Sequence, residues 1–403
     1  MQVGSQPINE VNQVPEPQYQ PDFYSTAFIE DSMPHYKRMR DLGPAVWLPR
    51  HKVWAVCRYE DVKQALSNDE VLISGEGVAV NGFTNKLMTG DNTVTLTADG
   101  ADHARRRRAL GKPLSIKAVR ELKNQIQDEA DSLIDRLLVK SNFDGVADFA
   151  EHLPVHIVSN LLGIPEAGRK NMLNWSTQSF NTTGPYNWRT LKSVPAAFQM
   201  VKYGTKISRD SIDPKGWVNN LYDAADEGIL GENEVPGMVL DYMAPSLDTT
   251  ITASSHMVYL LGRHPDAWEE LRADPDLISG VARESLRLAS PIRGWCRYAT
   301  QDVEVGGTII PAHSRVLVVL ASANHDERKW DDPEKFDIHR NPRDHVAFGF
   351  GSHSCLGRHL AQLEMESLLR AMAPRVSRIE AGEPRLAINN TLRGFASLPV
   401  KFN

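Results

Sequence analysis

The sequence predicts a mainly α-helical fold with small β-sheets, and three observations support this fold class. Apolar residues recur at the spacing of amphipathic helices along much of the 403-residue chain. Runs of β-branched and aromatic residues are few and short, which predicts small sheets. Hydrophobic residues make up 41% of the chain, enough for a sizeable core, while no apolar run reaches the roughly 18 residues of a membrane-spanning helix.

The predicted elements follow in chain order. Residues 1–20 are polar, rich in Gln and Pro and unlike a signal peptide, so we expect a flexible N-terminal tail. No Pro/Gly/Ser-rich linker follows, so residues 21–403 are expected to form a single domain. The patterns predict a hairpin over 45–48 and 53–57, helices over 62–66, 119–138, 155–162, 175–180, 235–262 and 277–288, and a buried strand over 316–320.

Charge and cysteine usage narrow the possible functions. The net charge of −6 argues weakly against a nucleic-acid partner. The three cysteines, Cys57, Cys296 and Cys355, cannot form a disulfide framework. A reducing, cytoplasmic location is therefore expected.

The most informative segment is glycine-rich and runs from Phe348 to Gly357, with the sequence FGFGSHSCLG. Cys355 is expected to open an amphipathic helix, whose apolar positions are Ala361, Met365, Leu368, Leu369 and Met372. Backbone N–H groups and the dipole at a helix start favour a sulfur anion, so the pattern suits a thiolate bound to one metal. A buried, inert cysteine is the alternative. A cysteine-nucleophile phosphatase is disfavoured, because Ala361 stands where that chemistry needs an arginine.

Other clusters in the sequence have plain structural interpretations when taken alone. Glu284 and Arg287 share one helix face, as an exposed ion pair would. The basic run 103–108 is typical of a solvated face or a nucleic-acid patch. Asp248 and Thr249 place an acid and an alcohol in an otherwise apolar helix, which is costly without a function, although a Thr bonded to its own helix is the common alternative.

The glycine-rich segment resembles the haem-ligand loop of the cytochrome P450 monooxygenases. The family pattern Phe-x-x-Gly-x-x-x-Cys-x-Gly is matched by Phe348, Gly351, Cys355 and Gly357. The resemblance implies the cytochrome P450 fold, haem b as cofactor and Cys355 as the axial ligand of the haem iron. It also implies that the haem propionates are bound by His103, Arg107, Arg297 and His353.

The same resemblance assigns roles to the other clusters. Glu284, Arg287 and Arg340 match the buried Glu-Arg-Arg network that braces the cysteine loop in these enzymes, and Asp248 with Thr249 matches the pair that relays protons to oxygen. Pro245-Ser246 replaces the usual Ala-Gly before that pair, and the proline is expected to kink the helix. Electrons from NAD(P)H would arrive through a separate reductase and a ferredoxin-like iron–sulfur protein. Arg105, Arg106 and Arg108 are expected to point outward. Together with Lys112 and Arg358 they suit docking of this acidic carrier, with plain solubility as the alternative.

Within the family, the chain is most similar to bacterial P450s that demethylate methoxybenzoates. The stretches that carry this similarity are 42–44, 179–181, 184–185, 389–394 and 397–400. The resemblance implies a small aromatic substrate pocket, although each of its residues could equally be plain core. The implied lining residues are Leu96, Phe180, Thr183, Ala244, Ile292, Trp295 and Phe395.

The loop before Leu96 predicts the charge of the substrate. Relatives that oxidise benzoates carry an arginine there, whereas residues 76–103 contain no arginine and Lys86 as their only cation besides histidine. We therefore expect a neutral, guaiacol-like methoxyarene, with Arg293 as a residue that could still reach an anion. The alternative substrate is a terpene, a fatty acid or another small aliphatic molecule. A second alternative function is a haem sensor without catalytic activity, and the Asp248-Thr249 pair argues against it.

Overall fold

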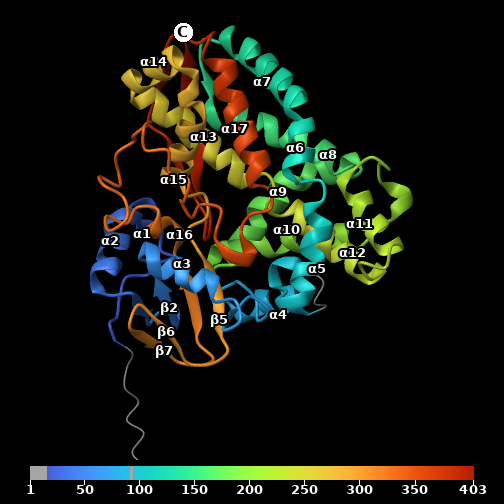
Figure 1. Ribbon diagram of the computed structural model, residues 1–403, viewed down its shortest axis with the longest axis vertical. Helices are drawn as coiled ribbons and strands as arrows, with labels where there is room; N and C mark the ends of the chain where they lie inside the picture. The colour runs from blue at the N-terminus through green and yellow to red at the C-terminus, as the bar shows by residue number, and fades with distance from the viewer. Residues whose placement is uncertain (1–15, 91–93) are drawn as a thin grey trace, which may run out of the picture.

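The computed structural model describes residues 16–90 and 94–403, which form a mainly helical molecule (Figure 1). The α-helices are α1 (Thr26–Glu30), α2 (Ser32–Leu42), α3 (Tyr59–Ser67), α4 (Gly82–Thr89), α5 (Gly100–Gly111), α6 (Ile116–Glu121), α7 (Lys123–Leu138), α8 (Ser159–Leu161), α9 (Glu166–Thr182), α10 (Trp188–Gly204), α11 (Trp217–Asp226), α12 (Val235–Met243), α13 (Asp248–Arg263), α14 (Pro265–Ala273), α15 (Ile278–Ala289), α16 (Leu320–Ala323) and α17 (Arg358–Met372). Shorter 3-10 and π-helical turns join them, among them η1 (Thr95–Thr97), η2 (Gly145–Ala150), η3 (Pro154–Val158), η6 (Pro275–Leu277) and η7 (Gly351–His353).

The strands form small sheets, as the sequence predicts. The largest described sheet has the order β1-β2-β8-β5-β3, with β1 (Ala45–Leu48), β2 (Val53–Val56), β3 (Leu72–Ile73), β5 (Trp295–Ala299) and β8 (Arg315–Val318). The smaller sheets contain β4 (Phe143–Asp144), β6 (Val303–Val305), β7 (Thr308–Ile310), β9 (Ile379–Ala381), β10 (Arg385–Ile388), β11 (Arg393–Ser397) and β12 (Pro399–Phe402). β1 and β2 pair antiparallel with Trp47 opposite Trp54, which confirms the predicted hairpin.

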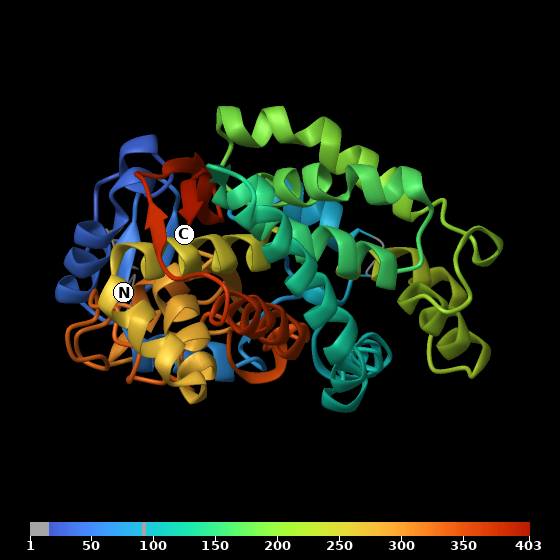
Figure 2. The same ribbon diagram turned by 90° about the horizontal axis from the view of Figure 1, so that it is seen from above.

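The two views show that early and middle segments of the chain lie on different sides of the molecule. In Figure 1, β2 lies at the lower left with α1, α2 and α3 beside it, whereas α11 and α12 lie at the right, and the blue and yellow-green segments are likewise on opposite sides in Figure 2. Helices α13, α15 and α17 contribute many of the residues of the largest apolar core. None of the described helices is both long and apolar enough to cross a bilayer.

The segment just after the N-terminus differs from its prediction. Residues 1–15 lie outside the described part of the chain, but residues 16–20 are not a loose tail. Trp47 N–H donates to the Pro17 carbonyl at 2.8 Å, and Tyr19 N–H donates to the Trp47 carbonyl at 2.9 Å. This backbone pairing extends the edge of β1, because an edge strand offers unpaired donors and acceptors.

Several predicted helices are divided in the structure. The helix expected over 119–138 becomes α6 and α7, which meet at Leu122, and the helix expected over 155–162 is π-helical before the short α8. Residues 62–66, 175–180 and 277–288 lie in α3, in α9, and in η6 with α15. β8 ends at Val318, two residues before the predicted end of that strand.

The predicted long helix over 235–262 is interrupted rather than merely kinked. α12 ends at Met243 and α13 begins at Asp248, with Pro245 between them. Proline has no N–H to donate back along the helix, and its ring clashes with the preceding turn. The break places the first turn of α13 beside the main cavity of the molecule, which Thr249 lines.

Candidate active site

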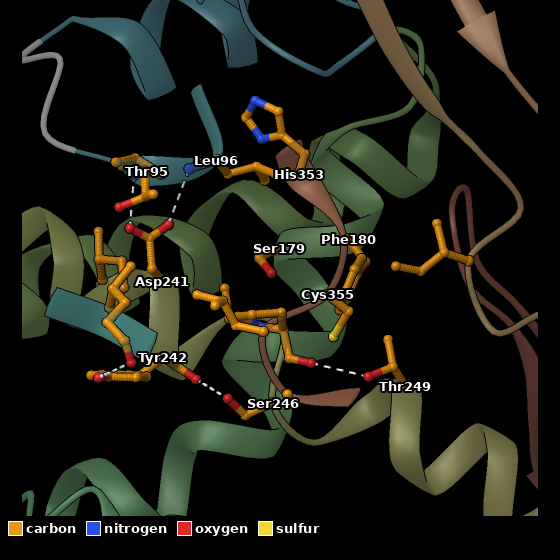
Figure 3. Close-up of a pocket in the computed structure, with 18 of the residues that line it drawn as sticks. Thr95, Leu96, Ser179, Phe180, Asp241, Tyr242, Ser246, Thr249, His353 and Cys355 are labelled. Atoms are coloured by element: carbon orange, nitrogen blue, oxygen red, sulfur yellow. Dashed lines mark hydrogen bonds between the residues drawn. The ribbon is translucent and has the colours of Figure 1, made fainter. Parts of the chain in front are cut away.

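A cavity of about 790 Å³ lies between the glycine-rich segment and the break in the long helix. Its walls come from elements far apart in the chain, including α4, α5, α9, α10, α12, α13 and β5. Cys355 and Thr249 lie near one another on one side, and Asp241 and Thr95 lie on the opposite side (Figure 3).

The loop that carries Cys355 is shaped by close backbone contacts. Gly351 has a φ of +71°, and a Cβ there would approach the Leu66 carbonyl oxygen to 2.5 Å. A side chain at this position would therefore be both strained and obstructed. Cys355 N–H donates to the Phe348 carbonyl at 2.8 Å, which closes the loop. α17 begins at Arg358, so Cys355 precedes the helix by three residues instead of opening it as predicted.

Cys355 lines the cavity and is exposed to it. Burial raises the pKa of its thiol, while the backbone N–H groups of Gly357 and Arg358 and the cations Arg107 and Arg358 act in the opposite direction. These donors supply the stabilisation of a sulfur anion that the start of a helix offers. The site therefore suits a Cys355 thiolate that binds a cation, such as a metal ion.

Cys355 does not belong to a cluster of potential metal ligands among the described residues. Across the described ranges, no group of three or more His, Cys, Asp or Glu side chains is placed to hold a metal ion. The resemblance to the cytochrome P450s implies that haem supplies the other ligands of a metal bound by Cys355.

A cluster of two arginines and two histidines marks where acidic substituents of such a prosthetic group would lie. His103, Arg107, Arg297 and His353 all line the cavity. The rings of His103 and His353 stack with their centroids 4.0 Å apart, and burial, followed by the nearby Arg297, lowers the pKa of His353 to about 2.

This cluster has donors that the protein does not use. Nε2 of His103 is buried and has no hydrogen-bond partner among the described residues. Arg297, 5% exposed, donates within the protein to the carbonyl of the adjacent Cys296, at 3.2 Å. Because buried polar groups are almost always hydrogen-bonded, the cluster is built for an anionic ligand. Phe348 and Gly357 also line this part of the cavity, as predicted for cofactor-binding residues.

The structure brings Glu284, Arg287 and Arg340 together behind the loop. Arg287 donates two hydrogen bonds of 2.8 Å to the Glu284 carboxylate, and Arg340 donates a third of 3.1 Å. Glu284 and Arg287 are fully buried. This arrangement is a fork of guanidinium donors around one carboxylate, and its geometry is that of a strong, directional ion pair.

The break between α12 and α13 is stabilised by hydroxyl groups. The free carbonyl oxygens of Tyr242, Ala244 and Pro245 accept hydrogen bonds from Ser246, Ser176 and Thr249, respectively. Ser246, one of the two residues that depart from the family pattern, is therefore one of the caps. Side-chain donors thus replace the backbone N–H groups that the interrupted helix lacks.

Asp248 and Thr249 point in different directions. Thr249 lines the cavity and donates to the Pro245 carbonyl at 3.1 Å. Asp248 is directed toward α9, where Oδ1 accepts a 2.6 Å hydrogen bond from the Thr177 hydroxyl. Its Oδ2 is buried without a partner among the described residues, and burial raises its pKa. Thr177, which the sequence did not single out, is thus part of this group.

Most of the predicted substrate residues line the same cavity. They are Leu96, Phe180, Thr183, Ala244, Ile292 and Trp295. Phe395 is an exception and corrects the prediction, because its ring stacks on His256 at a centroid distance of 4.1 Å instead of lining the cavity. Arg293 does not line it either. Its guanidinium donates to Phe23, Tyr36 and Asn390 and lies over the Phe23 ring.

The comparison with known proteins identifies the family of the chain. A family model described as "Cytochrome P450" matches residues 205–375. Cytochrome p450 CYP199A2 of Rhodopseudomonas palustris is 34% identical over 383 residues, which cover 94% of this chain and 93% of that protein. The chain belongs to the cytochrome P450 family.

Two further relatives support the same conclusion about activity and fold. The cytochrome P450 monooxygenase PikC of Streptomyces venezuelae is 30% identical, with 93% of this chain and 92% of that protein covered. The solved structure of P450BioI in complex with an acyl carrier protein ligated to hexadec-9Z-enoic acid superposes with a TM-score of 0.84 at 24% identity, covering 94% of this chain and 99% of that chain. The protein is a P450-type monooxygenase, and its fold is the P450 fold.

Enzymes of this family bind haem b, and the residues of this P450 fit that cofactor. Cys355 is the candidate axial ligand, and the unused donors of His103 and Arg297 suit the propionates. The cavity combines one thiol, this cluster of arginines and histidines and a largely apolar remainder, which is the donor set that haem requires.

The basic residues of this P450 are distributed differently from the prediction. Arg106 is buried and donates to Glu234 at 2.7 Å, and Arg105 binds the same carboxylate at 2.7 and 2.9 Å. The predicted outward orientation is therefore wrong for Arg106, because a buried guanidinium needs an anionic partner. Arg108 is exposed as predicted, and Lys112 and Arg358 are exposed as well.

Sequence reasoning missed a residue that links the buried ion pair of this P450 to the cysteine loop. The Asn324 carbonyl accepts a 2.6 Å hydrogen bond from Arg287, and its side-chain oxygen accepts one of 2.8 Å from Val346 N–H. Asn324 is thus a physical bridge between the ion pair and the residues leading to Phe348. An asparagine directly after the mostly apolar stretch 319–323 is the signal that could have identified it.

Proposed function

We propose that this P450 hydroxylates or O-demethylates a small neutral aromatic molecule, such as a guaiacol-like methoxyarene. The observation that carries the proposal is the aromatic wall of the cavity. Phe180 and Trp295 lie with ring centroids 5.9 Å apart, beside the apolar side chains of Leu96, Ala244 and Ile292. Paired aromatic faces favour a planar ring, because tilted and offset ring contacts add to the gain from apolar burial.

The charge of the cavity supports a neutral substrate. Among the described lining residues, the cationic side chains are those assigned to the propionates. Lys86 is absent from the lining, and Arg293 is engaged elsewhere. Positions 91–93 of the loop that lacks an arginine fall outside the described residues, but the sequence provides no cation there. A benzoate would therefore enter without a partner for its charge, which is unfavourable.

In the proposed reaction, different residues of the cavity bind the substrate and deliver protons. When bound, haem supplies the activation of O2 by two electrons. Phe180 and Trp295 hold and orient the ring, and the hydroxyl of Thr249 lies on the cavity wall, where it can pass a proton. Asp248 forms a hydrogen-bonded carboxyl group behind it, on the side of α9. Hydroxylation of a methoxy carbon gives a hemiacetal, which breaks down to a phenol and formaldehyde.

We also propose that the two electrons come from NAD(P)H through a reductase and a separate acidic iron–sulfur protein. Arg108, Lys112 and Arg358 are exposed near the ends of α5 and α17, on the side of the molecule that covers Cys355. Exposed cations of this kind steer an acidic partner toward the haem ligand and raise its association rate.

Substrate-induced spectral titration of the haem-loaded protein tests the substrate class. We expect guaiacol to bind more tightly than 2-methoxybenzoate of similar size, because the acid lacks a cationic partner. A cyclic terpene and a medium-chain fatty acid serve as aliphatic controls. Tighter binding of the benzoate, or of either aliphatic compound, would contradict the proposed substrate class.

Replacement of Thr249 by alanine tests the proposed proton delivery. The variant removes the hydroxyl that lines the cavity and also the hydrogen bond to Pro245. We expect the yield of product per NAD(P)H consumed to fall by about tenfold or more, in line with the usual contribution of a positioned acid or base. Thr249→Ser, which keeps the hydroxyl, is the matched control and should recover most of the yield. Full coupling in the alanine variant would rule out this role.

A further inference from the structure

Asp241 is an acidic side chain on the substrate side of the cavity, and the sequence analysis gave it no role. It lies on α12, and Figure 3 shows it across the cavity from Cys355 and Thr249. The other carboxylate among the described lining residues is Glu364, which lies on α17, the helix that follows the cysteine loop. Asp241 is thus the acid that a substrate would meet at the end remote from the reacting carbon.

The Asp241 carboxylate is held in a fixed position by η1. Oδ2 accepts a 2.7 Å hydrogen bond from Thr95 N–H, and Oδ1 has a weaker contact of 3.5 Å with Leu96 N–H. A carboxylate offers about four acceptor positions. These contacts use at most two of them, so acceptor capacity remains for a ligand in the cavity.

A hydroxyl group accompanies this carboxylate. Thr95 also lines the cavity and is only 5% exposed. Its Oγ1 makes no hydrogen bond of good geometry with any described residue, although it lies close enough to contribute to lowering the pKa of Asp241. A buried, unused hydroxyl beside a carboxylate indicates a polar ligand, because such groups normally have partners.

The charge of this subsite is not neutralised by the protein. Asp241 makes no salt bridge with a described residue, and its nearest cationic influence, Arg106, is bound to Glu234 at 2.7 Å. Burial raises the pKa of Asp241 to about 6, against the lowering effect of the Thr95 and Leu96 N–H groups. The carboxyl group is therefore mostly ionised at neutral pH.

We propose that Asp241, together with the Thr95 hydroxyl, is a specificity-determining subsite that binds the phenolic hydroxyl of the substrate and excludes carboxylates. This inference rests on the proposed function and refines it. A phenol donates its O–H to the ionised carboxylate, and it can accept a hydrogen bond from Thr95. A benzoate at the same place would bring two anions together in a cavity with low dielectric constant, which costs binding energy steeply.

The alternative is that Asp241 only tethers η1 to α12. Such a tether would affect all ligands alike, because it would change the shape of the cavity and not its preference for a donor. The subsite instead predicts effects that depend on the chemistry of the ligand. Asp241→Asn separates these possibilities, because the amide keeps an oxygen for Thr95 N–H and removes the charge.

The experiment is a spectral titration of the haem-loaded protein with three ligands of similar size. They are guaiacol, which has a donor, 1,2-dimethoxybenzene, which has none, and 2-methoxybenzoate, which is an anion. In Asp241→Asn we expect guaiacol to bind about 10- to 100-fold more weakly, the range for losing a hydrogen bond to a charged group. The dimethoxy compound should change less than about twofold, and the benzoate should bind at least about tenfold more tightly as the repulsion disappears.

The matched control and the pH dependence complete the test. Thr95→Val should weaken guaiacol binding by a smaller factor and leave the benzoate unchanged, because it removes no charge. In the wild type, lowering the pH below the Asp241 pKa of about 6 should strengthen benzoate binding, and Asp241→Asn should abolish this dependence. Equal changes for all three ligands, or no change for any, would overturn the subsite.

A second ligand pair separates this inference from the proposed substrate class. Cyclohexanol and cyclohexyl methyl ether present the same contrast of donor and no donor without an aromatic ring. If both aliphatic ligands bind better than guaiacol but the alcohol still loses affinity in Asp241→Asn, the aromatic substrate class fails and the subsite stands. If guaiacol binds best and is indifferent to the variant, the subsite fails and the aromatic class stands.

Discussion

Replacing Cys355 with serine is expected to remove thiolate ligation and with it the monooxygenase activity. Cys355 is the thiol that faces the cavity, and the N–H groups of Gly357 and Arg358 are directed at its sulfur. A serine hydroxyl is a far weaker ligand, because it stays protonated at neutral pH. The reduced carbon monoxide spectrum of the purified variant reports the loss directly, and turnover should fall by several orders of magnitude.

Cys57→Ala is the matched control for this change. Cys57 lies in the core formed with β2, away from the cavity, and burial raises the pKa of its thiol to about 12. This variant should keep the wild-type spectrum and activity, with a modest loss of stability from the small void. An unchanged ligand signature in Cys355→Ser would remove the basis for the assigned site.

Replacement of Glu284 by alanine is expected to give the largest loss of stability. The carboxylate accepts hydrogen bonds from Arg287 and Arg340, and Glu284 and Arg287 are fully buried. Removing one partner of a buried pair leaves an uncompensated charge and typically costs about 3–5 kcal/mol. Urea unfolding of the haem-loaded protein should show a lower midpoint. Haem should also be lost at a lower urea concentration, because Arg287 donates to Asn324, which in turn accepts from Val346 N–H at the start of the cysteine loop.

Asp41→Asn provides the contrast with a surface pair. Its partner Lys37 is 60% exposed, and the two groups are 3.0 Å apart on α2. Exposed pairs contribute little to stability, so the unfolding midpoint should hardly move. If Glu284→Ala unfolds at the same urea concentration as Asp41→Asn, the buried ion pair does not brace the fold.

The sequence was most informative where function is encoded locally. The cysteine loop, the hairpin of β1 and β2 and the shared helix face of Glu284 and Arg287 each depend on residues within a short stretch of chain. Spacing alone located the hairpin and the shared helix face. It predicted an exposed pair and a helix opening at Cys355, whereas the pair is fully buried and α17 begins at Arg358. The partner that completes the ion pair, Arg340, came from the resemblance, because no local pattern connects it to Glu284.

The misplaced residues depend on distant parts of the chain. Arg106 looked exposed because its partner Glu234 lies far along the sequence, and Phe395 was assigned to the pocket although His256 covers its ring. The break before Asp248 was predicted only as a kink, since one of its hydroxyl caps, Ser176, comes from α9. The sequence did not predict a role for Asp241, because a single acid on an apolar helix forms no motif. Its role becomes visible only when η1 is placed beside α12 and Thr95 N–H donates to it.

The interruption of the long helix separates the residue proposed for ligand preference from the residue proposed for proton delivery. α12 carries Asp241 and α13 carries Thr249, and the segment between them is held by side-chain hydroxyls in place of a continuous backbone ladder. In a continuous helix both residues would share one axis, whereas here Asp241 and Thr249 lie on two separate helices. We therefore expect that substitutions on α12 can alter the ligand preference while Thr249 on α13 keeps its role in the reaction.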